Sequence, residues 1–393
     1  MSTVAVSEAP TLQSNEPAQR VTPRLVSLDA YRGFVMLLMV SEVMQVPAVA
    51  NHFPGSAAWG IIGQQFDHTK WAGCSLWDLI QPSFMFIVGV SLPFSLASRR
   101  AKGQTFGWLL FHAMVRSLVL VGLGIFLYST TQARTNFIFT NVLAQIGLAY
   151  PFLFLIAWTR PRMQAIAAAA ILVAYWGAFV LYPWPHGPSA GFAAHWAKNA
   201  NLAWAFDRWF LNLFPRSAPW LASPGGYATL NFVPSLATMI FGLLAGELLR
   251  GGLRPIQKLG VLLAAGGIGL GLGWALGHFG ICPAVKRIWT PSWAIYSTGW
   301  TLLLLLLFHA AIDLAGLKRW AFPLVVVGMN PLAIYCMANL LEGFLRENLD
   351  RHLGPHTFNV FGDYAPLVKG GLILVMLWMV CWWMYRRRAF LRI

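Results

Sequence analysis

The chain has 393 residues, of which 58% are hydrophobic and only 10% are charged. Soluble domains carry about 25% charged residues, so this composition excludes an ordinary soluble protein and predicts a polytopic helical membrane protein. The net charge of +15 does not indicate nucleic-acid binding, because the cations fall in short clusters between apolar runs.

The first 22 residues are polar, contain two prolines and lack the apolar core of a signal peptide. We therefore expect a disordered cytoplasmic tail at 1–22, followed by a single transmembrane domain at 23–393. The expected fold is an all-α bundle of about ten transmembrane helices, because ten apolar stretches are each close to the ~20 residues that a bilayer crossing needs. The predicted spans are 32–50, 76–97, 108–128, 139–158, 163–182, 228–249, 256–278, 293–312, 321–341 and 366–385.

The cation clusters predict the orientation of the chain. Lys and Arg accumulate in cytoplasmic loops, and here the clusters occur at both ends of the chain and in every second connection between spans. We expect the protein in the inner (plasma) membrane with both termini in the cytoplasm. The loop that carries His68 and the loop 183–227 are then expected in the periplasm. The clusters lie at 20–24, 99–102, 160–162, 250–258, 318–319 and 386–388.

The stretch 66–97 combines a polar loop with the start of an apolar helix. His68 lies in the loop, and Asp78 lies in the first turns of the predicted helix. Ionisable groups at a membrane boundary are costly to keep, so both are candidates for a functional site. The alternative is a surface histidine and an acidic residue that stabilises a helix N-terminus. Ten residues of separation do not establish that the two side chains meet.

Other polar residues lie inside or at the edge of predicted spans. Asp29 and Arg32 are three residues apart, which suits an ion pair on one helix face. Arg116 lies about eight residues into its span, and Asn330 opens another. Singly, such residues are typical of helix packing or of snorkelling to the interface. Together they predict a polar cavity within the bundle that opens to both sides of the membrane.

Two further patterns concern structure. Gly269, Gly273 and Gly277 recur every four residues, and small residues at this spacing allow two membrane helices to approach closely. Cys74 and Cys282 both fall in predicted outer loops, where an oxidising compartment permits a disulfide. Chance placement of the two cysteines is the favoured interpretation, because sequence does not show that their Cα atoms come close.

Six short stretches follow one another between residues 24 and 341. The first, at 24–34, reads RLVSLDAYRGF, and the second runs from HTKWAG at 68 through DLIQP at 78 to FIVG at 86. The remaining four are RSL at 116, NVLAQIGLAY at 141, PAVKRIWTPS at 283 and GMNP at 328. Taken together and in this order, the six stretches resemble the transmembrane acyltransferases of the heparan-α-glucosaminide N-acetyltransferase type and their bacterial relatives.

The resemblance implies an enzyme that takes an acetyl group from cytoplasmic acetyl-CoA and places it on an amino sugar across the membrane. It also implies that His68 matches the essential histidine of the family. Imidazole, with an ordinary pKa near 6.5, can remove a proton from the attacking amine or carry the acetyl group itself, and both routes stay open. Asp78 is the second candidate catalytic residue, because it could orient His68.

The other candidate site residues are assigned to binding. Arg32, Arg116 and Asn330 are expected to bind acetyl-CoA from the cytoplasmic side, since guanidinium groups match phosphate oxygens. On the outer side, the sequence predicts that indole rings stack on the sugar acceptor, although membrane-interface tryptophans produce the same placement. The candidate acceptor-binding residues are Trp71, Lys286 and Trp289.

Two alternatives to this function remain. The chain could be a transporter or permease for a sugar or acyl compound, with His68 as a gating or substrate-binding group. It could also transfer another acyl group, such as succinyl, or use a hydroxyl acceptor. Acetyl-CoA is the expected cosubstrate, and no metal is expected because zinc and phosphate-loop motifs are absent from the sequence. The expected partners are the lipid bilayer and an amino-sugar or glycan acceptor, with a homodimer left open.

Overall fold

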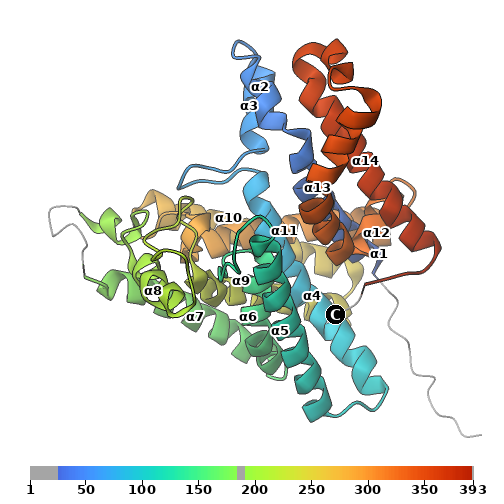
Figure 1. Cartoon of the computed structure of the whole chain (residues 1–393). Helices are drawn as coiled ribbons and strands as arrows, with labels where there is room; N and C mark the ends of the chain where they lie inside the picture. The colour runs from blue at the N-terminus through green and yellow to red at the C-terminus, as the bar shows by residue number, and fades with distance from the viewer. Residues whose placement is uncertain (1–24, 184–190, 392–393) are drawn as a thin grey trace, which may run out of the picture.

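A computed structural model describes residues 25–183 and 191–391 of the chain (Figure 1). These residues form helices joined by loops, with no β-strand among them, so the predicted all-α fold is confirmed. One isolated β-bridge joins Ala72 to Val285. The predicted tail 1–22 lies outside the described residues, as does part of the loop 183–227.

Within the described residues, seven helices are long and apolar enough to cross a membrane. Each agrees with one of the predicted spans, so the chain is a multi-pass membrane protein. The seven are α4 (Ile80–Ala101) with the preceding turn η2 (Trp77–Leu79), α5 (Phe106–Ser129), α7 (Pro161–Leu181), α9 (Phe232–Arg250), α10 (Pro255–His278), α11 (Pro291–Phe308) and α14 (Ala365–Arg386).

The other three predicted spans form shorter or broken helices. Helices α1 (Val26–Val40) and α6 (Val142–Ile156) have 15 residues each, and α1 continues into the turn η1 (Ser41–Met44). Helices α12 (Phe322–Gly328) and α13 (Pro331–Leu353) make one bent pair, with an angle of 81° between them. The bend lies at Asn330, because the residue before a proline is disfavoured in helical conformation. All ten predicted stretches are therefore helical.

The remaining elements lie between these helices or project from the bundle. Helices α2 and α3 project from the bundle beside the outer ends of α13 and α14 (Figure 1). The short elements are α2 (Val46–Asn51), α3 (Ala57–Gln65), η4 (Phe192–Trp196), α8 (Leu202–Phe210), η5 (Leu211–Leu213), η6 (Thr229–Asn231), η7 (Lys286–Ile288), the π-helical turn η8 (His309–Leu314) and η9 (Thr357–Tyr364).

Glycines set the closest helix contacts in the bundle. A Cβ atom at Gly269 would lie 3.0 Å from the Cα of Gly299, and one at Gly273 would lie 2.6 Å from the Cβ of Tyr296. Both glycines therefore hold α10 against α11, as their spacing predicts. A Cβ at Gly242 of α9 would lie 2.1 Å from the carbonyl oxygen of Phe86 in α4. Helix α4, which follows the His68 loop, is thus fixed in the middle of the bundle.

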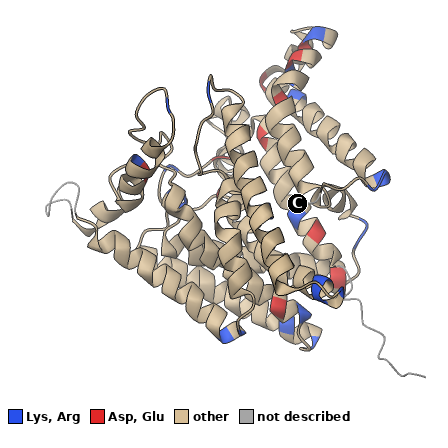
Figure 2. Cartoon of the chain, turned by 60° about the horizontal axis from the view of Figure 1, so that its bottom comes forward, with Lys and Arg blue, Asp and Glu red and all other residues tan. Residues whose placement is uncertain are grey.

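Figure 2 shows that most Lys and Arg residues lie at helix ends and in loops, with several together at one end of the bundle. This distribution is typical of a membrane protein, because a cation within the hydrocarbon region is costly. Which side of the membrane this end faces remains a prediction.

Candidate active site

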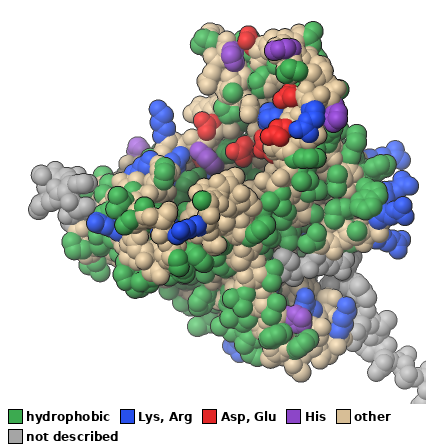
Figure 3. All heavy atoms as spheres, viewed as in Figure 1, with side chains coloured by type: hydrophobic (Ala, Val, Ile, Leu, Met, Phe, Trp, Pro, Cys, Tyr) green, Lys and Arg blue, Asp and Glu red, His purple; other side chains and the backbone are tan. Residues whose placement is uncertain are grey.

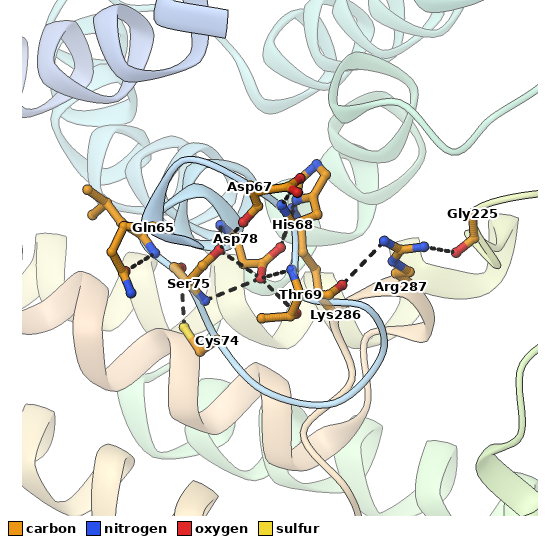
Figure 4. Close-up of polar contacts among 11 residues, drawn as sticks. Gln65, Asp67, His68, Thr69, Cys74, Ser75, Asp78, Gly225, Lys286 and Arg287 are labelled. Atoms are coloured by element: carbon orange, nitrogen blue, oxygen red, sulfur yellow. Dashed lines mark hydrogen bonds and ion pairs between the residues drawn. The ribbon is translucent and has the colours of Figure 1, made fainter. Parts of the chain in front are cut away.

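The first site residue, His68, lies in the loop between α3 and η2. Its Nδ1 atom is 2.8 Å from Oδ1 of Asp78, so the two candidate catalytic residues are in contact (Figure 4). The side chain of Asp78 is 2% exposed, whereas that of His68 is 35% exposed. The loop therefore folds back so that an accessible imidazole rests on a buried carboxylate.

The carboxylate of Asp78 is held by donors from its own loop. Its Oδ2 atom accepts hydrogen bonds from the backbone N–H and the hydroxyl of Thr69, at 3.1 and 2.8 Å. The backbone N–H and the hydroxyl of Ser75 donate to the same oxygen, at 3.3 and 3.1 Å. Because Oδ2 is occupied by these donors, Oδ1 remains for the imidazole, and the carboxylate has one orientation.

The contact with Asp78 favours one tautomer of His68. A carboxylate only accepts, so at 2.8 Å the Nδ1 atom donates its proton to Asp78, and Lys286 Nζ, 3.2 Å from Nδ1, then donates to the carboxylate and not to the ring. The Nε2 atom then holds the free lone pair of the neutral ring. No residue in the described part of the chain hydrogen-bonds to Nε2, and His68 lines a cavity. The dyad therefore presents a base, or a nucleophile, to that cavity.

Lys286 is the third charged group at the dyad. Its Nζ atom lies 3.3 Å from Oδ1 of Asp78 and 3.2 Å from Nδ1 of His68. Its side chain is 6% exposed, and burial lowers the pKa of Lys286, although the charge of Asp78 opposes this shift. Lys286 thus contacts the carboxylate of Asp78 and also lines the cavity. The sequence analysis assigned it only to binding of the acceptor.

Backbone contacts bring Lys286 to the dyad. The bridge between Ala72 and Val285 and the hydrogen bond from Gly73 N–H to the carbonyl of Ala284, at 3.0 Å, join the two loops. Gly73 has a φ of +125°, a conformation that favours glycine. The loop before α4 and the loop before α11 therefore form one unit.

Arg287 adds a third loop to this unit. Its guanidinium donates to the carbonyl oxygens of Thr69 and Gly225, at 3.3 and 2.6 Å (Figure 4). It also lies over the ring of Tyr227, 5.4 Å from the centroid, and the ring of Tyr227 meets the edge of His68. The segment 225–227 is thereby held beside the imidazole.

The cavity beside the dyad, which we call the His68 cavity, has a volume of about 370 Å³. This volume lies within the range of small-molecule sites. Its walls combine apolar groups with carboxylates, amides and phenols. The polar residues that line it are Glu42, His68, Gln81, Tyr128, Thr140, Asn141, Tyr227, Lys286, Tyr335, Asn339 and Glu342.

A second cavity of about 440 Å³, which we call the arginine cavity, is lined by Arg32, Arg99 and Arg116. Arg32 pairs with Asp29 at 3.3 Å, as their spacing predicts. Arg116 lies over the ring of Tyr150, 4.6 Å from its centroid. Three guanidinium groups and one carboxylate, Asp29, line this cavity, so its excess of positive charge favours an anionic ligand.

The two cavities share two wall residues, Val142 and Tyr335. They also lie toward opposite ends of α4, because Asp78 directly precedes this helix and Arg99 lies in its last turn. A helix of 22 residues is about 33 Å long, which matches the hydrocarbon thickness of a bilayer. Two neighbouring cavities therefore lie along α4 where the sequence predicts one polar cavity, and its opening to both sides of the membrane remains a prediction.

Asn330 and the two candidate tryptophans line neither cavity. The side chain of Asn330 bonds to the backbone of Ala389 and Leu391, both at 3.1 Å, and so holds the C-terminal segment, part of which lines the arginine cavity. The indole of Trp71 donates to the carbonyl of Trp196, and that of the fully buried Trp289 approaches the hydroxyl of Thr238 at 3.3 Å. Both indoles join interior elements of the fold.

Cys74 and Cys282 do not form a disulfide; both are free thiols. Burial raises the pKa of the Cys74 thiol to about 12 and also raises the pKa of Cys282. Both groups are therefore neutral packing residues. Within the described residues, no three His, Cys, Asp or Glu side chains form a group that could hold a metal ion.

Sequence reasoning missed several residues of the site. Thr69 and Ser75 lie inside the second quoted stretch, and their hydroxyls donate to the carboxylate of Asp78. Hydroxyl residues this close to an acidic residue in the sequence were a usable signal for such hydrogen bonds. Arg99 stood in a cation cluster that was read only as a topology signal. Nothing in the sequence brings Tyr227 or Glu342 to the cavity that His68 lines, because their placement depends on the tertiary fold.

Heparan-alpha-glucosaminide N-acetyltransferase of Homo sapiens is 23% identical over 82% of this chain and 54% of the human protein. The chain is therefore similar in sequence to this acetyltransferase over most of its own length. The heparan-alpha-glucosaminide N-acetyltransferase of Mus musculus is 30% identical over 26% of this chain and 13% of the mouse protein. No protein-family model matches the chain.

The resemblance to the heparan-alpha-glucosaminide N-acetyltransferases is therefore confirmed. The chain spans about half the length of the human acetyltransferase that it matches. The similarity covers most of this chain.

Proposed function

We propose that the chain is a transmembrane acetyltransferase that moves an acetyl group from cytoplasmic acetyl-CoA to the amine of a periplasmic amino sugar. One observation carries this proposal: the Asp78-oriented imidazole of His68 lines a cavity that shares Val142 and Tyr335 with the arginine cavity. Homology to proteins named as N-acetyltransferases supports the reaction class.

The arginine cavity has the donor set that acetyl-CoA requires. Arg32, Arg99 and Arg116 would bind its phosphates, and the apolar walls suit its pantetheine arm. The Nε atom of Arg116 is buried and has no hydrogen-bond partner in the described part of the chain, which is consistent with a missing anionic ligand. When bound, the thioester supplies an acetyl group activated for attack by an amine.

In the first route, His68 acts as a general base. Its Nε2 atom takes the proton that the amine loses while the new C–N bond forms, and Asp78 stabilises the resulting imidazolium. As the C–S bond breaks, His68 returns this proton to the sulfur, so the products are the amide and free CoA thiol. Lys286 keeps the Asp78 carboxylate paired throughout.

In the second route, His68 acts as a nucleophile. Its Nε2 atom attacks the acetyl carbon and the C–S bond breaks, so that the thiolate leaves. The amine then attacks the acetyl group on the ring, the bond to Nε2 breaks, and the proton that the amine loses neutralises the thiolate. The Asp78 contact serves this route too, because it keeps the Nδ1 proton in place and leaves Nε2 free to react. An acetylated enzyme that accumulates without acceptor would identify this route.

The proposed orientation rests on the cation distribution, with the inner membrane as the site. Lys70 is exposed next to the dyad, and Arg388 is exposed at the opposite end of the fold. Cysteine variants at these positions should react with a membrane-impermeant thiol reagent differently in intact cells, with Lys70→Cys labelled and Arg388→Cys protected. The reverse pattern would invert the direction of transfer.

The reaction itself is tested with purified protein, radiolabelled acetyl-CoA and a panel of amino sugars. We expect N-acetylated product, and we expect His68→Ala to form almost none. Uptake of labelled sugar into proteoliposomes without any acetylated product would instead identify a transporter. Product formed only from another acyl-CoA, or only with neutral sugars, would change the donor or the acceptor class.

A further inference from the structure

Two carboxylates face the His68 cavity from outside the catalytic loop. Glu42 lies on the turn η1 after the first helix, and Glu342 lies on α13. Figure 3 shows acidic side chains gathered where the upper part of the molecule meets the rest of it. The mechanism described above uses neither carboxylate.

Arg346 holds the two carboxylates near each other. Its guanidinium pairs with Glu342 at 2.9 Å and donates to the carbonyl oxygen of Val43 at 3.1 Å. It therefore attaches α13 to the residue that follows Glu42. Among residues 25–183 and 191–391, no Lys or Arg forms an ion pair with Glu42, and the nearby charge of Glu342 repels a second negative charge there. One carboxylate of the pair is thus left without a cation.

The same cavity contains amide donors without acceptors. Asn141 is 8% exposed, and its Oδ1 atom accepts from the N–H of Ala144 at 2.9 Å. Its Nδ2 atom is buried and has no hydrogen-bond partner within the described residues, and the same holds for Nε2 of Gln81. Buried donors without acceptors are rare and costly in proteins. Because both residues line the cavity, a ligand with acceptor oxygens would satisfy them.

We propose that Glu42 and Glu342 form a cation subsite for the ammonium group of the acceptor, with Asn141 and Gln81 donating to its hydroxyl oxygens. This proposal rests on the proposed function and names the feature by which the site selects its substrate: a protonated primary amine on a polyhydroxylated ring. A neutral sugar of the same size would leave Glu42 without a counterion. The subsite lies in the cavity that His68 lines, so an amine held there is within the reacting compartment. An ammonium has no lone pair, so it first gives one proton to the carboxylate of Glu42, and the neutral amine then attacks by either route. Glu42 releases this proton to solvent after the amide has formed.

Binding without acetyl-CoA tests the subsite separately from the reaction. The full-length protein in detergent is titrated calorimetrically with methyl glucosaminide, which carries the amine, and with methyl glucoside, which lacks it. We expect the amine to bind about tenfold more tightly at neutral pH. Glu42→Gln should abolish this preference and leave the affinity for methyl glucoside unchanged.

Matched variants separate recognition from folding. Glu342→Gln should act like Glu42→Gln, but it also breaks the pair with Arg346, so its melting temperature is measured alongside. Glu347→Gln, an exposed acid on the same helix that does not line the cavity, should retain the wild-type preference. If Glu42→Gln binds the amine as tightly as wild type, or if wild type shows no preference, the subsite does not exist.

The two proposals fail in distinguishable ways. A preference for the amine that Glu42→Gln removes, without acetyl transfer from acetyl-CoA, would retain the cation subsite and overturn the proposed reaction. Acetyl transfer with a KM for glucosaminide that Glu42→Gln does not change would retain the reaction and overturn the subsite.

Discussion

Lys286 and Asp78, 208 residues apart in the chain, form a buried ion pair with 3.3 Å between Nζ and Oδ1. This pair and the backbone bridge beside it connect the loop before α4 to the loop before α11. The orientation of His68 therefore depends on contacts between distant parts of the chain.

The first prediction concerns this ion pair. Lys286→Met removes the cation and leaves a buried carboxylate without its counterion, which typically costs about 3–5 kcal/mol of stability. We expect a clearly lower melting temperature in detergent. The control is Lys369→Met, because Lys369 pairs with Asp350 at 2.6 Å but the Asp350 side chain is 41% exposed. Such exposed pairs contribute about 0–1 kcal/mol. If the melting temperature falls equally in the two variants, burial does not make the Lys286–Asp78 pair more important for stability than the Lys369–Asp350 pair.

The second prediction concerns His68. His68→Ala should reduce acetyl transfer by about 10²–10⁴ if His68 is a general base, and nearly to zero if it carries the acetyl group. Its side chain is partly exposed, so the melting temperature and acetyl-CoA binding should change little. His52→Ala is the matched control, because this exposed histidine also lies beside an aspartate, at 3.4 Å from Asp363. Wild-type turnover in His68→Ala would remove the dyad from the mechanism.

The third prediction concerns the tautomer of His68. Asp78→Asn keeps the size of the side chain but replaces one oxygen by an NH2 group. The amide oxygen is needed by the donors Thr69 and Ser75, so the NH2 group faces His68 and the Nδ1 proton of His68 loses its acceptor. Turnover should fall by about 10²–10⁴, and acetyl-CoA affinity should remain near wild type. A fall in affinity as large as the fall in turnover would assign Asp78 to the architecture of the loop instead.

The fourth prediction concerns the arginine cavity. Arg99→Ala should weaken acetyl-CoA binding about tenfold, because it removes one of three guanidinium groups from the cavity wall. Its neighbour Arg100 does not line the cavity and lies over the ring of Trp158 instead, so Arg100→Ala should bind normally. Calorimetric titration with CoA measures both.

Arg32→Ala extends this test. It should weaken acetyl-CoA binding more than acceptor binding, since Arg32 lines the arginine cavity and not the His68 cavity. Arg32 also bonds to Asp29 and to Ser91, so an unchanged CoA affinity with a lowered melting temperature would assign it to helix packing.

The sequence predicted the helices better than the site. Apolar stretches of membrane length indicate spans because every backbone polar group must be satisfied inside the helix, and this constraint is local. The Asp29–Arg32 pair was predictable for the same reason, since i,i+3 neighbours share a helix face. The contact of His68 with Asp78 was not, because it depends on how Thr69 and Ser75 fold the loop around the carboxylate.

The surroundings of the candidate binding residues could not be predicted from the sequence. Trp71 and Trp289 were chosen because aromatic rings suit sugars, yet each indole N–H points to an interior oxygen, which only the tertiary fold reveals. Glu42 and Glu342 are 300 residues apart, and only the packing of η1 beside α13 brings both to the His68 cavity.

The last prediction concerns Asp207, a fully buried residue of α8, outside the predicted spans. Burial raises the pKa of Asp207 to about 6, although the N–H of Thr229 and the charge of Arg216 oppose the shift. The folded state therefore binds this proton more tightly than the unfolded chain, whose ordinary value is 3.8. The stabilisation is fully present below pH 3.8 and is lost as the pH rises through about 6.

Asp207→Asn tests this sign, because the amide stays neutral at every pH and can still accept from Thr229. We expect the melting temperature of wild type to fall relative to that of the variant as the pH rises from 4 to 7. A shift of about two pKa units corresponds to a difference of at most about 3 kcal/mol. Asp67→Asn, an exposed residue, serves as the control and should follow wild type. Parallel curves for wild type and Asp207→Asn would mean that Asp207 is ionised in the folded protein throughout this range, with its burial compensated by Arg216.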